Sequence, residues 1–258
     1  MKATPQISRH WRAHDYAYLL RRWKTVARKS GLAMQPFAGA GGFELYYMTP
    51  AKQRPGPVLY LSAGIHGDEP GATEGLIAWA EGSRDFLRGY QTMIFPCLNP
   101  WGLCHNNRLD SRGRDLNRCY HENRVPQVAA HKKLLRGRRF HLAVALHEDY
   151  DAPGMYVYEI PNSKPYLAES ILALGSHHVP VDPRKRIEGR PARSGVVRKT
   201  IRPDLLPGHP EAFFLHFYCA DRTLTVETPS EFCLDQRVAA HGAGLQAVES
   251  AFLAAGRC

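Results

Sequence analysis

Residues 59–74, LYLSAGIHGDEPGATE, decide the fold that we predict for this chain. The apolar run over residues 57–63 predicts a buried strand, and Gly64 ends it. Pro70 suits the first turn of a helix, and an amphipathic segment follows it. The stretch therefore predicts a strand, a tight turn and a helix, in that order.

His66 and Glu69 fall in the predicted turn. Open α/β sheets bind their ligands beyond the carboxyl ends of the strands, so both side chains are expected at a binding edge. There they could supply two of the three protein ligands of a catalytic zinc. In the alternative interpretation, Glu69 caps the helix and His66 is an ordinary loop histidine. Because a His-x-x-Glu pair has low specificity, a zinc site also requires a third ligand, a base and an oxyanion donor.

Predicted strands and helices alternate along the chain. We expect strands at 43–48, 57–63, 92–98, 140–146, 155–160 and 223–226, and helices at 13–29, 70–81, 125–135, 165–174 and 235–255. Residues 102–120 are polar and are expected to be irregular. Alternating elements with uniformly apolar strands indicate a mainly parallel sheet with helices on both faces.

The composition is that of an ordinary globular protein, with 258 residues of which 44% are apolar and 22% charged. No apolar run approaches the roughly 20 residues that span a bilayer, so we expect no membrane span. The first 20 residues lack the pattern of a signal peptide, which favours a cytoplasmic location. Six scattered cysteines without a Cys-x-x-Cys pair argue against a thiolate zinc site and against a disulfide scaffold.

The chain is basic, with a formal net charge of +10, and residues 184–202 hold eight Arg or Lys and one acid. Such a charge could attract nucleic acid, acidic lipids or a substrate with several carboxylates. The basic segment is predicted to be a long loop or a small hairpin. It is either a solvated surface or a rim that attracts substrate carboxylates.

Ionisable residues follow three of the predicted strands: His66 with Glu69, then His147, then Glu227. Burial beside such groups is costly unless they are paired or bound to a metal. His, Glu and His form a ligand set seen at catalytic zinc, with Glu227 available as a general base. Taken singly, His147 could be a satisfied strand-end histidine and Glu227 a surface carboxylate.

Four arginines lie between these strands, at positions 108, 112, 114 and 118. An arginine near zinc can donate to the oxyanion of a tetrahedral intermediate. Another can grip a substrate carboxylate through two parallel hydrogen bonds. For Arg112 and Arg114 we prefer a plain surface role.

The order of these motifs resembles the carboxypeptidase A-like zinc peptidases, a superfamily that includes the succinylglutamate desuccinylases and aspartoacylases. The resemblance spans roughly residues 58–230 and rests on His66-x-x-Glu69, Asn99-Pro100-x-Gly102, Arg108, Asp115-Leu116-Asn117-Arg118, His147 and Glu227-Thr228-Pro229. It implies a three-layer α/β/α fold with a mixed, mostly parallel central sheet. We expect a single catalytic domain over residues 1–258, on which residues 1–40 pack as an N-terminal helical extension.

The resemblance further implies one zinc ion and a role for each matching residue. His66, Glu69 and His147 would be the ligands, Glu227 the base, Arg108 the group that polarises the scissile carbonyl, and Asn117 with Arg118 the site of the substrate carboxylate. Enzymes of the carboxypeptidase A type also carry a tyrosine on a mobile loop, but residues 182–209 contain none. His147-Glu148 and the short chain are similar to the desuccinylase and aspartoacylase branch or to murein peptide amidases, whereas Glu227-Thr228-Pro229 is similar to the peptidases.

The favoured hypothesis is a zinc-dependent hydrolase of an amide bond next to a free carboxylate, above all a metallocarboxypeptidase that acts on a small peptide. The first alternative is an N-acyl-amino-acid deacylase of the desuccinylase and aspartoacylase type. The second is a non-catalytic basic protein on the same fold that binds nucleic acid or acidic membrane. Every expected ligand and catalytic position is filled, which argues against this last alternative, so nucleic acid is not an expected partner.

Overall fold

The computed structural model describes residues 10–160, 164–198, 200–202 and 208–255. Its strands are β1 (Leu32–Ala40), β2 (Phe43–Pro50), β3 (Val58–Ser62), β4 (Gln91–Phe95), β5 (Leu142–Asp149), β6 (Tyr156–Ile160), β7 (Arg186–Ile187), β8 (Arg190–Pro191), β9 (Val196–Arg198) and β10 (Thr223–Pro229). Its helices are α1 (Tyr16–Ser30), α2 (Pro70–Gly82), α3 (Arg84–Gly89), α4 (Pro100–His105), α5 (Pro126–Leu135), α6 (Ala168–Gly175), α7 (Glu211–Tyr218) and α8 (Leu234–Ala255), with a 3₁₀ turn, η1 (Leu116–Arg118).

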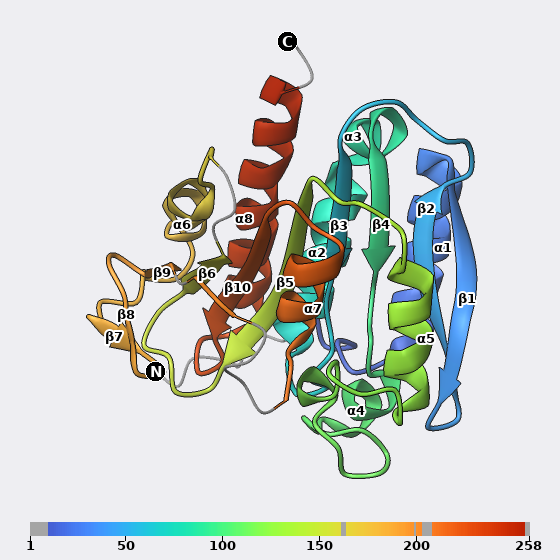
Figure 1. Ribbon diagram of the computed structural model, residues 1–258, viewed down its shortest axis with the longest axis horizontal. Helices are drawn as coiled ribbons and strands as arrows, with labels where there is room; N and C mark the ends of the chain where they lie inside the picture. Colours follow the sequence, from blue (N-terminus) through green and yellow to red (C-terminus); the bar gives the residue numbers. More distant parts are fainter. Residues whose placement is uncertain (1–9, 161–163, 199, 203–207, 256–258) are drawn as a thin grey trace, which may run out of the picture.

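Eight strands form one sheet in the order β1-β2-β4-β3-β5-β10-β6-β9 (Figure 1). The central strands β4, β3, β5 and β10 pair in parallel, and β9 pairs in parallel with β6. The pairings of β1 with β2, β2 with β4, and β10 with β6 are antiparallel. The sheet is therefore mixed and mostly parallel, as predicted.

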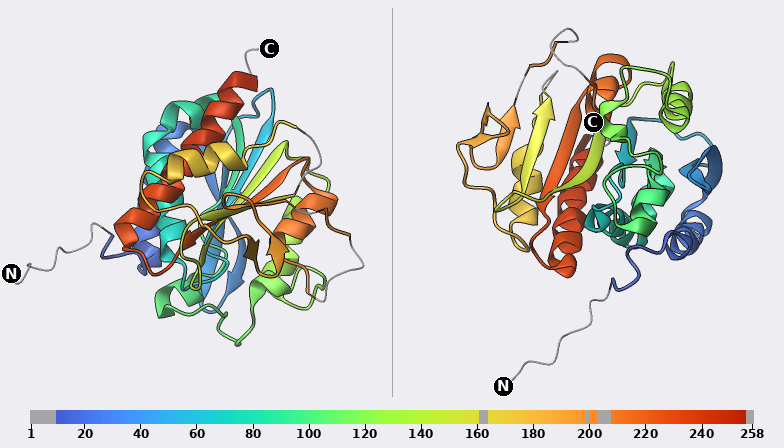
Figure 2. Two further views of the ribbon diagram at one scale, coloured as in Figure 1. Left: turned by 90° about the vertical axis from the view of Figure 1, so that its left-hand side faces the viewer. Right: turned by 90° about the horizontal axis from the view of Figure 1, so that it is seen from below.

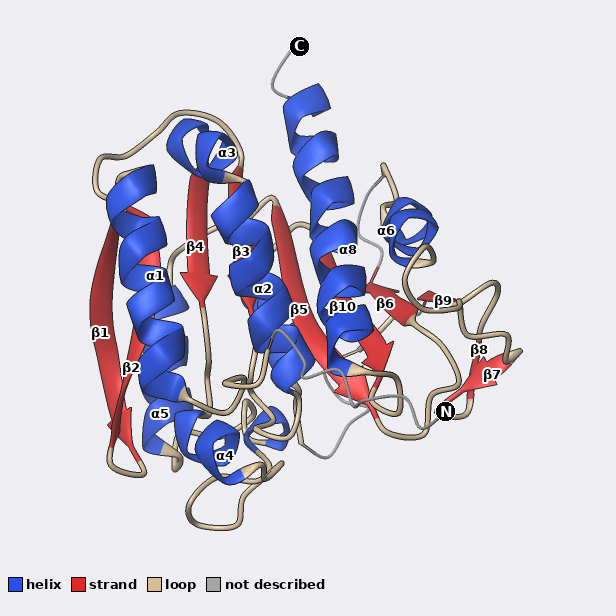
Figure 3. Cartoon of the chain, turned by 180° about the vertical axis from the view of Figure 1, so that it is seen from behind, coloured by secondary structure: helices blue, strands red, loops and turns tan. Residues whose placement is uncertain are grey.

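Helices cover both faces of the sheet, which confirms the three-layer α/β/α class. Helices α1, α2, α6 and α8 pack on one face, seen in front of the sheet in Figure 3, and α5 and α7 pack on the other. Figure 2 shows the sheet between these two layers. Strand β3 contributes to both cores, because Leu59 and Leu61 point to the first layer and Tyr60 to the second. This two-sided burial explains why β3 is a continuous apolar run.

The loop after β3 is held by close backbone packing. Gly64 has φ +65°, a conformation that favours glycine. A Cβ atom on Gly67 would lie 1.9 Å from the carbonyl carbon of Gly102 in α4. Only glycine fits at that contact, so α4 fixes the path of the loop that carries His66 and Glu69.

Residues 32–40 correct the prediction of a helical extension over residues 1–40. Helix α1 ends at Gly31, whose φ of 65° stops the helix, and the following residues form β1. Gly41 and Gly42, with φ of 60° and 85°, turn the chain so that β1 pairs with β2. Residues 1–9 lie outside the described part of the chain, and the assignment of residues 1–258 to one domain stays a prediction.

Several further segments differ from the predictions, among them α3, which was not predicted. Residues 102–105, which were expected to be irregular, belong to α4, because Pro100 stands in its first turn and the Asn99 side chain accepts a hydrogen bond from the Gly102 N–H. Helix α7 and the edge strand β9 were not predicted. The basic segment contains the β7–β8 hairpin, which agrees with the expectation of a small hairpin. Among the described helices, none is long and apolar enough to span a membrane.

Candidate metal centre and active site

His66 and Glu69 lie in the loop between β3 and α2, and both are 3% exposed. Glu69 occupies the N-cap position of α2, but its side chain makes no capping hydrogen bond. Its carboxylate instead turns to two histidines. The structure therefore does not support the alternative in which the Glu69 side chain caps α2.

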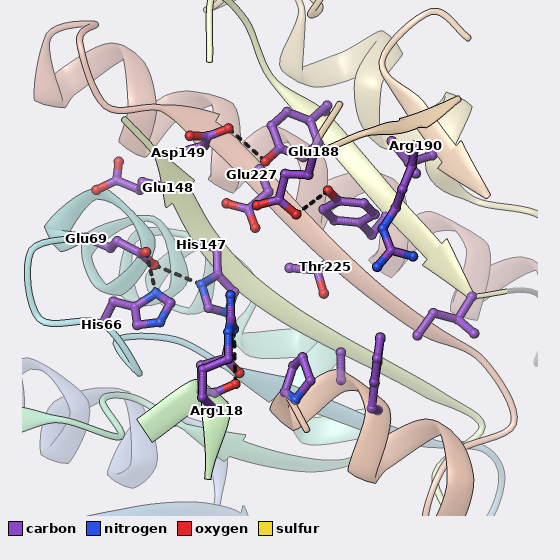
Figure 4. Close-up of a pocket in the computed structure, with 18 of the residues that line it drawn as sticks. His66, Glu69, Arg118, His147, Glu148, Asp149, Glu188, Arg190, Thr225 and Glu227 are labelled. Carbon is purple, nitrogen blue, oxygen red and sulfur yellow. Dashed lines mark hydrogen bonds and ion pairs between the residues drawn. The ribbon is translucent and has the colours of Figure 1, made fainter. Parts of the chain in front are cut away.

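The side chains of His66, Glu69 and His147 form a buried cluster whose potential ligand atoms all lie within 4.8 Å of one another (Figure 4). Nδ1 of His66 lies 2.6 Å from Oε1 of Glu69, and Nδ1 of His147 lies 3.0 Å from Oε2. The second contact lacks hydrogen-bond geometry, so Oε2 is a buried acceptor without a hydrogen bond among the described residues. A cation between the three groups would satisfy this oxygen, and two imidazoles with one carboxylate suit zinc.

The cluster also fits a cation electrostatically. Burial opposes ionisation of Glu69, but the two histidines outweigh it and hold the pKa of Glu69 well below its usual range. Burial likewise opposes protonation of His66, but Glu69 and then Asp115 raise the pKa of His66 to about 9. Without a metal, a proton on His66 supplies positive charge beside the buried Glu69 carboxylate.

Asp115 holds the other side of His66, a contact that the sequence did not reveal. Its Oδ1 lies 3.1 Å from Nε2 of His66 and accepts a hydrogen bond from the Asn117 N–H, at 2.9 Å. Arg108 donates to Oδ2 of Asp115, at 3.2 Å, and its Nη1 lies 3.6 Å from Oε1 of Glu69. A carboxylate on the outer nitrogen of a histidine fixes its orientation and leaves Nδ1 free to bind a metal. The only sequence signal was the position of Asp115 at the head of the Asp-Leu-Asn-Arg motif.

Glu227 lies beside His147, because the two residues are Cα partners in the parallel pairing of β10 with β5. Both residues stand within their strands rather than beyond them, since β5 and β10 run to Asp149 and Pro229. Burial raises the pKa of Glu227 to about 8; His147 opposes this shift and Glu69 adds to it. Burial therefore favours the protonated form of this carboxyl group.

Arg108, Asn117 and Arg118 line the same cavity of about 400 Å³ as the cluster and Glu227. The side-chain oxygen of Asn117 accepts a hydrogen bond from the Glu211 N–H, at 2.9 Å, and this contact fixes the side chain at the start of α7. Arg118 is exposed at the cavity, and its Nη1 donates to the Asn117 carbonyl, at 3.2 Å. The structure thus brings together every residue that the sequence marked for a site.

Arg112 and Arg114, for which we preferred a surface role, do not line this cavity. Arg114 pairs with the buried Asp110, at 3.0 Å through Nε, and the Arg112 N–H donates to the same carboxylate. These contacts with Asp110 stabilise the loop that carries the two arginines. Three tyrosines outside residues 182–209 do line the cavity, namely Tyr150, Tyr156 and Tyr158.

Glu148, next to His147, is a further buried carboxylate, to which the sequence analysis gave no role in the site. It accepts hydrogen bonds from the Gly71 N–H at 3.0 Å, from Nη1 of Arg237 at 2.8 Å and from Oγ1 of Thr228 at 3.3 Å. Gly71 stands two residues after Glu69, and Thr228 follows Glu227. One carboxylate therefore joins the three elements that carry His147, Glu69 and Glu227.

One family model and several solved structures are similar to this chain. Residues 55–148 match the family model described as "Succinylglutamate desuccinylase/Aspartoacylase catalytic domain". The matched range includes His66, Glu69 and His147 but ends before Glu227. A comparison with curated proteins gives no match.

Several solved structures share the fold. A "putative metallopeptidase" from Shewanella amazonensis SB2B is 21% identical, with a TM-score of 0.81 over 93% of this chain and 94% of that one. A metallo-carboxypeptidase from Burkholderia cenocepacia is 17% identical, with a TM-score of 0.66 over 91% and 67%. One from Pseudomonas aeruginosa, in complex with (2-guanidinoethylmercapto)succinic acid, is 18% identical, with a TM-score of 0.61 over 91% and 68%. The family match is in line with the predicted resemblance to the desuccinylase and aspartoacylase branch, and the solved structures show that the fold is shared with metallopeptidases and metallo-carboxypeptidases.

Proposed function

We propose that this chain is a zinc-dependent hydrolase that cleaves an amide bond next to a free carboxylate, with a C-terminal peptide bond as its principal target. The observation that carries the proposal is the buried cluster of His66, Glu69 and His147 with Glu227 beside it. A buried acceptor at Glu69 and two imidazole nitrogens that face it are the donor set that zinc requires.

His66, Glu69 and His147 would hold the ion. When bound, zinc would lower the pKa of a water molecule and polarise the substrate carbonyl. Glu227 would take a proton from the attacking water and return it to the departing nitrogen. The position of Glu227 beside His147, its Cα partner in the pairing of β10 with β5, supports this role.

Arg108 and Arg118 would have different roles in the reaction. The Arg108 guanidinium, close to Glu69, would donate hydrogen bonds to the oxyanion that forms on the scissile carbonyl. Arg118, exposed at the cavity, would hold the free carboxylate with help from the Asn117 amide. The substrate would then lie with its amide between Glu227 and the cluster.

An N-acyl-amino-acid deacylase is the second candidate, and the match of residues 55–148 to the desuccinylase and aspartoacylase domain favours it. Both candidates use the same residues and the same free carboxylate. They differ in the acyl side of the bond, which is a peptide in one case and a small acid in the other.

The test is a metal analysis followed by a substrate screen with and without a chelator. Peptides with free C-termini and N-acetyl and N-succinyl amino acids are compared at equal concentration. We expect zinc in the protein and chelator-sensitive release of the C-terminal amino acid. Hydrolysis of the N-acyl amino acids alone would favour the second candidate, and salt-dependent binding of DNA without any hydrolysis would refute both.

A further inference from the structure

Helix α5 and the segment that follows it carry a run of cations. Residues 131–139 read HKKLLRGRR, and residues 123–140 contain no Asp or Glu. Figure 1 shows α5 beside β1 and β2, at one edge of the sheet, and α5 packs against β1. The segment then enters β5 at its amino end, whereas the proposed active site lies near the carboxyl ends of β3, β5 and β10. The proposed reaction therefore does not account for these cations.

Two of these Lys and Arg side chains have partners within the chain. Arg139 forms an ion pair with Asp221. Lys132 donates hydrogen bonds to the Glu122 carbonyl, at 3.0 Å, and to the Asn123 side chain, at 2.8 Å. These contacts stabilise the fold, so Lys132 and Arg139 require no partner outside the chain.

Lys133, Arg136 and Arg138 differ from these two. All three are exposed, and within the described part of the chain none of them forms an ion pair. The helix dipole favours a cation at Lys133, in the last turn of α5, but Arg136 and Arg138 stand at and beyond the end of the helix. Nε of Arg138 donates to the Leu134 carbonyl, at 2.8 Å, and this hydrogen bond fixes the side chain. Burial, and then the charge of Arg136, lower the pKa of Lys132, which shows that the cations repel one another.

The same three cations line an open groove between α5 and β1, with a volume of about 630 Å³. Its floor is apolar and includes Pro36, Phe37 and Leu134, none of which is fully buried. The Phe37 ring packs edge-on against Phe95, with 5.4 Å between the ring centroids, so the core holds the floor in place. No Asp or Glu is among the described residues that line the groove. The groove therefore combines a fixed apolar floor with positive charge that has no acidic partner.

This combination favours one kind of partner. An extended peptide segment with an apolar side chain between acidic residues would place the apolar group on the floor and its carboxylates beside the cations. A second copy of this chain would be repelled, because each copy carries a formal net charge of +10. A flat lipid surface would not reach the recessed floor. A nucleobase stacks on an open ring face, whereas Tyr47 in the groove is buried and Phe37 is packed on Phe95.

We propose that the groove between α5 and β1 is a docking site for an acidic segment of another protein, bound by Lys133, Arg136 and Arg138 around the apolar floor. The segment would carry Asp or Glu on both sides of one large apolar side chain. The described residues that line the groove and those that line the active-site cavity do not overlap. The inference therefore goes beyond the proposed function and does not depend on it.

The probe is a short fluorescein-labelled peptide with a central Leu flanked by Glu on both sides, and both of its ends are blocked so that it has no free terminal carboxylate. A second peptide carries Ser in place of Leu. Fluorescence anisotropy measures the binding of each to the wild type, to Lys133→Glu/Arg136→Glu and to the milder Lys133→Gln/Arg136→Gln, at low and at high salt. The control is Lys24→Glu/Arg28→Glu, which makes the same change of charge at two exposed residues of α1, on the other face of the sheet.

We expect the wild type and the α1 control to bind the Leu peptide with affinities within about twofold of each other, because salt screens distant charges. Lys133→Glu/Arg136→Glu should bind it about tenfold more weakly or worse, and the Gln variant should fall between the two. The wild type should bind the Ser peptide about fivefold more weakly, since the apolar contact with the floor is lost. High salt should weaken the binding of both peptides.

Three results with the peptides would overturn the inference. They are no binding of the Leu peptide by the wild type at low salt, an equal loss of affinity in the α1 control, and equal affinity for the Leu and Ser peptides. The inference is also wrong if oligo(dT) or vesicles that contain phosphatidylserine bind more tightly than the peptide and lose this binding in Lys133→Glu/Arg136→Glu. None of these results bears on the proposed hydrolase, because the groove lies outside the active-site cavity.

Discussion

The Glu227 carboxyl group is half-buried between β5 and β6, with His147 and Tyr156 as its partners in the adjacent strands. Burial raises its pKa to about 8 when no metal is bound. A divalent ion at the neighbouring cluster would lower that pKa again, because positive charge favours the carboxylate. With the metal bound, Glu227 would thus be a carboxylate that can accept a proton from water.

Glu227→Gln should remove the proton exchange and leave the metal ligands intact. We expect kcat to fall by about 10²–10⁴-fold, the usual contribution of a general base, with zinc content unchanged. Steady-state kinetics and metal analysis on the same preparation test this. A variant that retains full kcat would show that another group is the base.

Arg118→Gln should weaken the binding of the substrate carboxylate and leave the chemical step unaffected. We expect KM to rise by about tenfold or more with kcat little changed, which is the pattern of lost ground-state and transition-state binding in equal measure. Arg112→Gln is the matched control, because Arg112 is exposed and does not line the cavity. An unchanged KM in Arg118→Gln would contradict its role as the carboxylate clamp.

At the scale of single residues, the sequence identified the groups that stand at or near the ends of apolar strands or within an ordered motif. His147 and Glu227 could be found this way because a strand fixes where its end residues point, and His66 with Glu69 because they form an ordered motif in the loop after β3. Asp115 and Glu148 could not be given roles, since their partners come from distant parts of the chain. A carboxylate acquires such a role only through tertiary contacts.

At the scale of elements, Glu148 ties β5 to the start of α2, to β10 and to α8. A Cβ atom on Gly71 would lie 2.2 Å from its Oε1, so glycine permits this close approach. The contact joins the elements that carry His147, Glu69 and Glu227. Their relative position therefore depends on a group outside the cluster of His66, Glu69 and His147.

Glu148→Gln should disturb this arrangement and leave Arg237 without its buried carboxylate. We expect zinc to bind about 10–100-fold more weakly, as for other supports of metal ligands. The free energy of unfolding should fall by about 2 kcal/mol. Competition with a coloured chelator measures the affinity, and urea unfolding measures the stability.

Glu249→Gln is the control for this variant. Glu249 is a carboxylate of α8 that accepts hydrogen bonds from Trp79 and Ser83, away from the cluster. It should lose comparable stability and keep its zinc affinity. If Glu148→Gln binds zinc as the wild type does, the carboxylate stabilises the fold without positioning the site.

At the scale of the whole molecule, most of the sheet was predictable because its central strands are buried on both faces. The elements that were not predicted form because of contacts with distant parts of the chain. Strand β1 is an edge strand interrupted by Pro36, with a register shift between Pro36 and Ala38, and its pattern of buried residues is irregular. Helix α7, EAFFLHFY, is short and rich in aromatic residues, which have low helix propensity, and it forms because Phe214 and Leu215 enter the second core.

The core between the sheet and helices α5 and α7 also predicts how the stability of the protein responds to acid. His131 lies between the hydroxyls of Tyr60 and Tyr120, at 3.0 and 2.7 Å, and burial lowers its pKa to about 3. In the unfolded chain its pKa is about 6.5. Between pH 6.5 and 3 the unfolded state therefore binds the extra proton, so stability falls as the pH falls through this window.

His131→Gln should remove this contribution. We expect the free energy of unfolding of the wild type to fall more steeply between pH 6 and pH 4 than that of the variant, by about 1.4 kcal/mol per pH unit. Urea unfolding across this range tests the slope. Parallel slopes would show that His131 is accessible to protons in the folded protein.

The central claim is that His66, Glu69 and His147 hold one catalytic zinc. The most direct measurement is a titration of zinc into chelator-treated protein while the release of a C-terminal amino acid is followed, for the wild type and for Glu69→Gln. The claim predicts no activity at the start, a rise that saturates at one zinc per chain, and no rise in a folded Glu69→Gln. Full hydrolysis in the presence of the chelator, or an equal rise in Glu69→Gln, would contradict it.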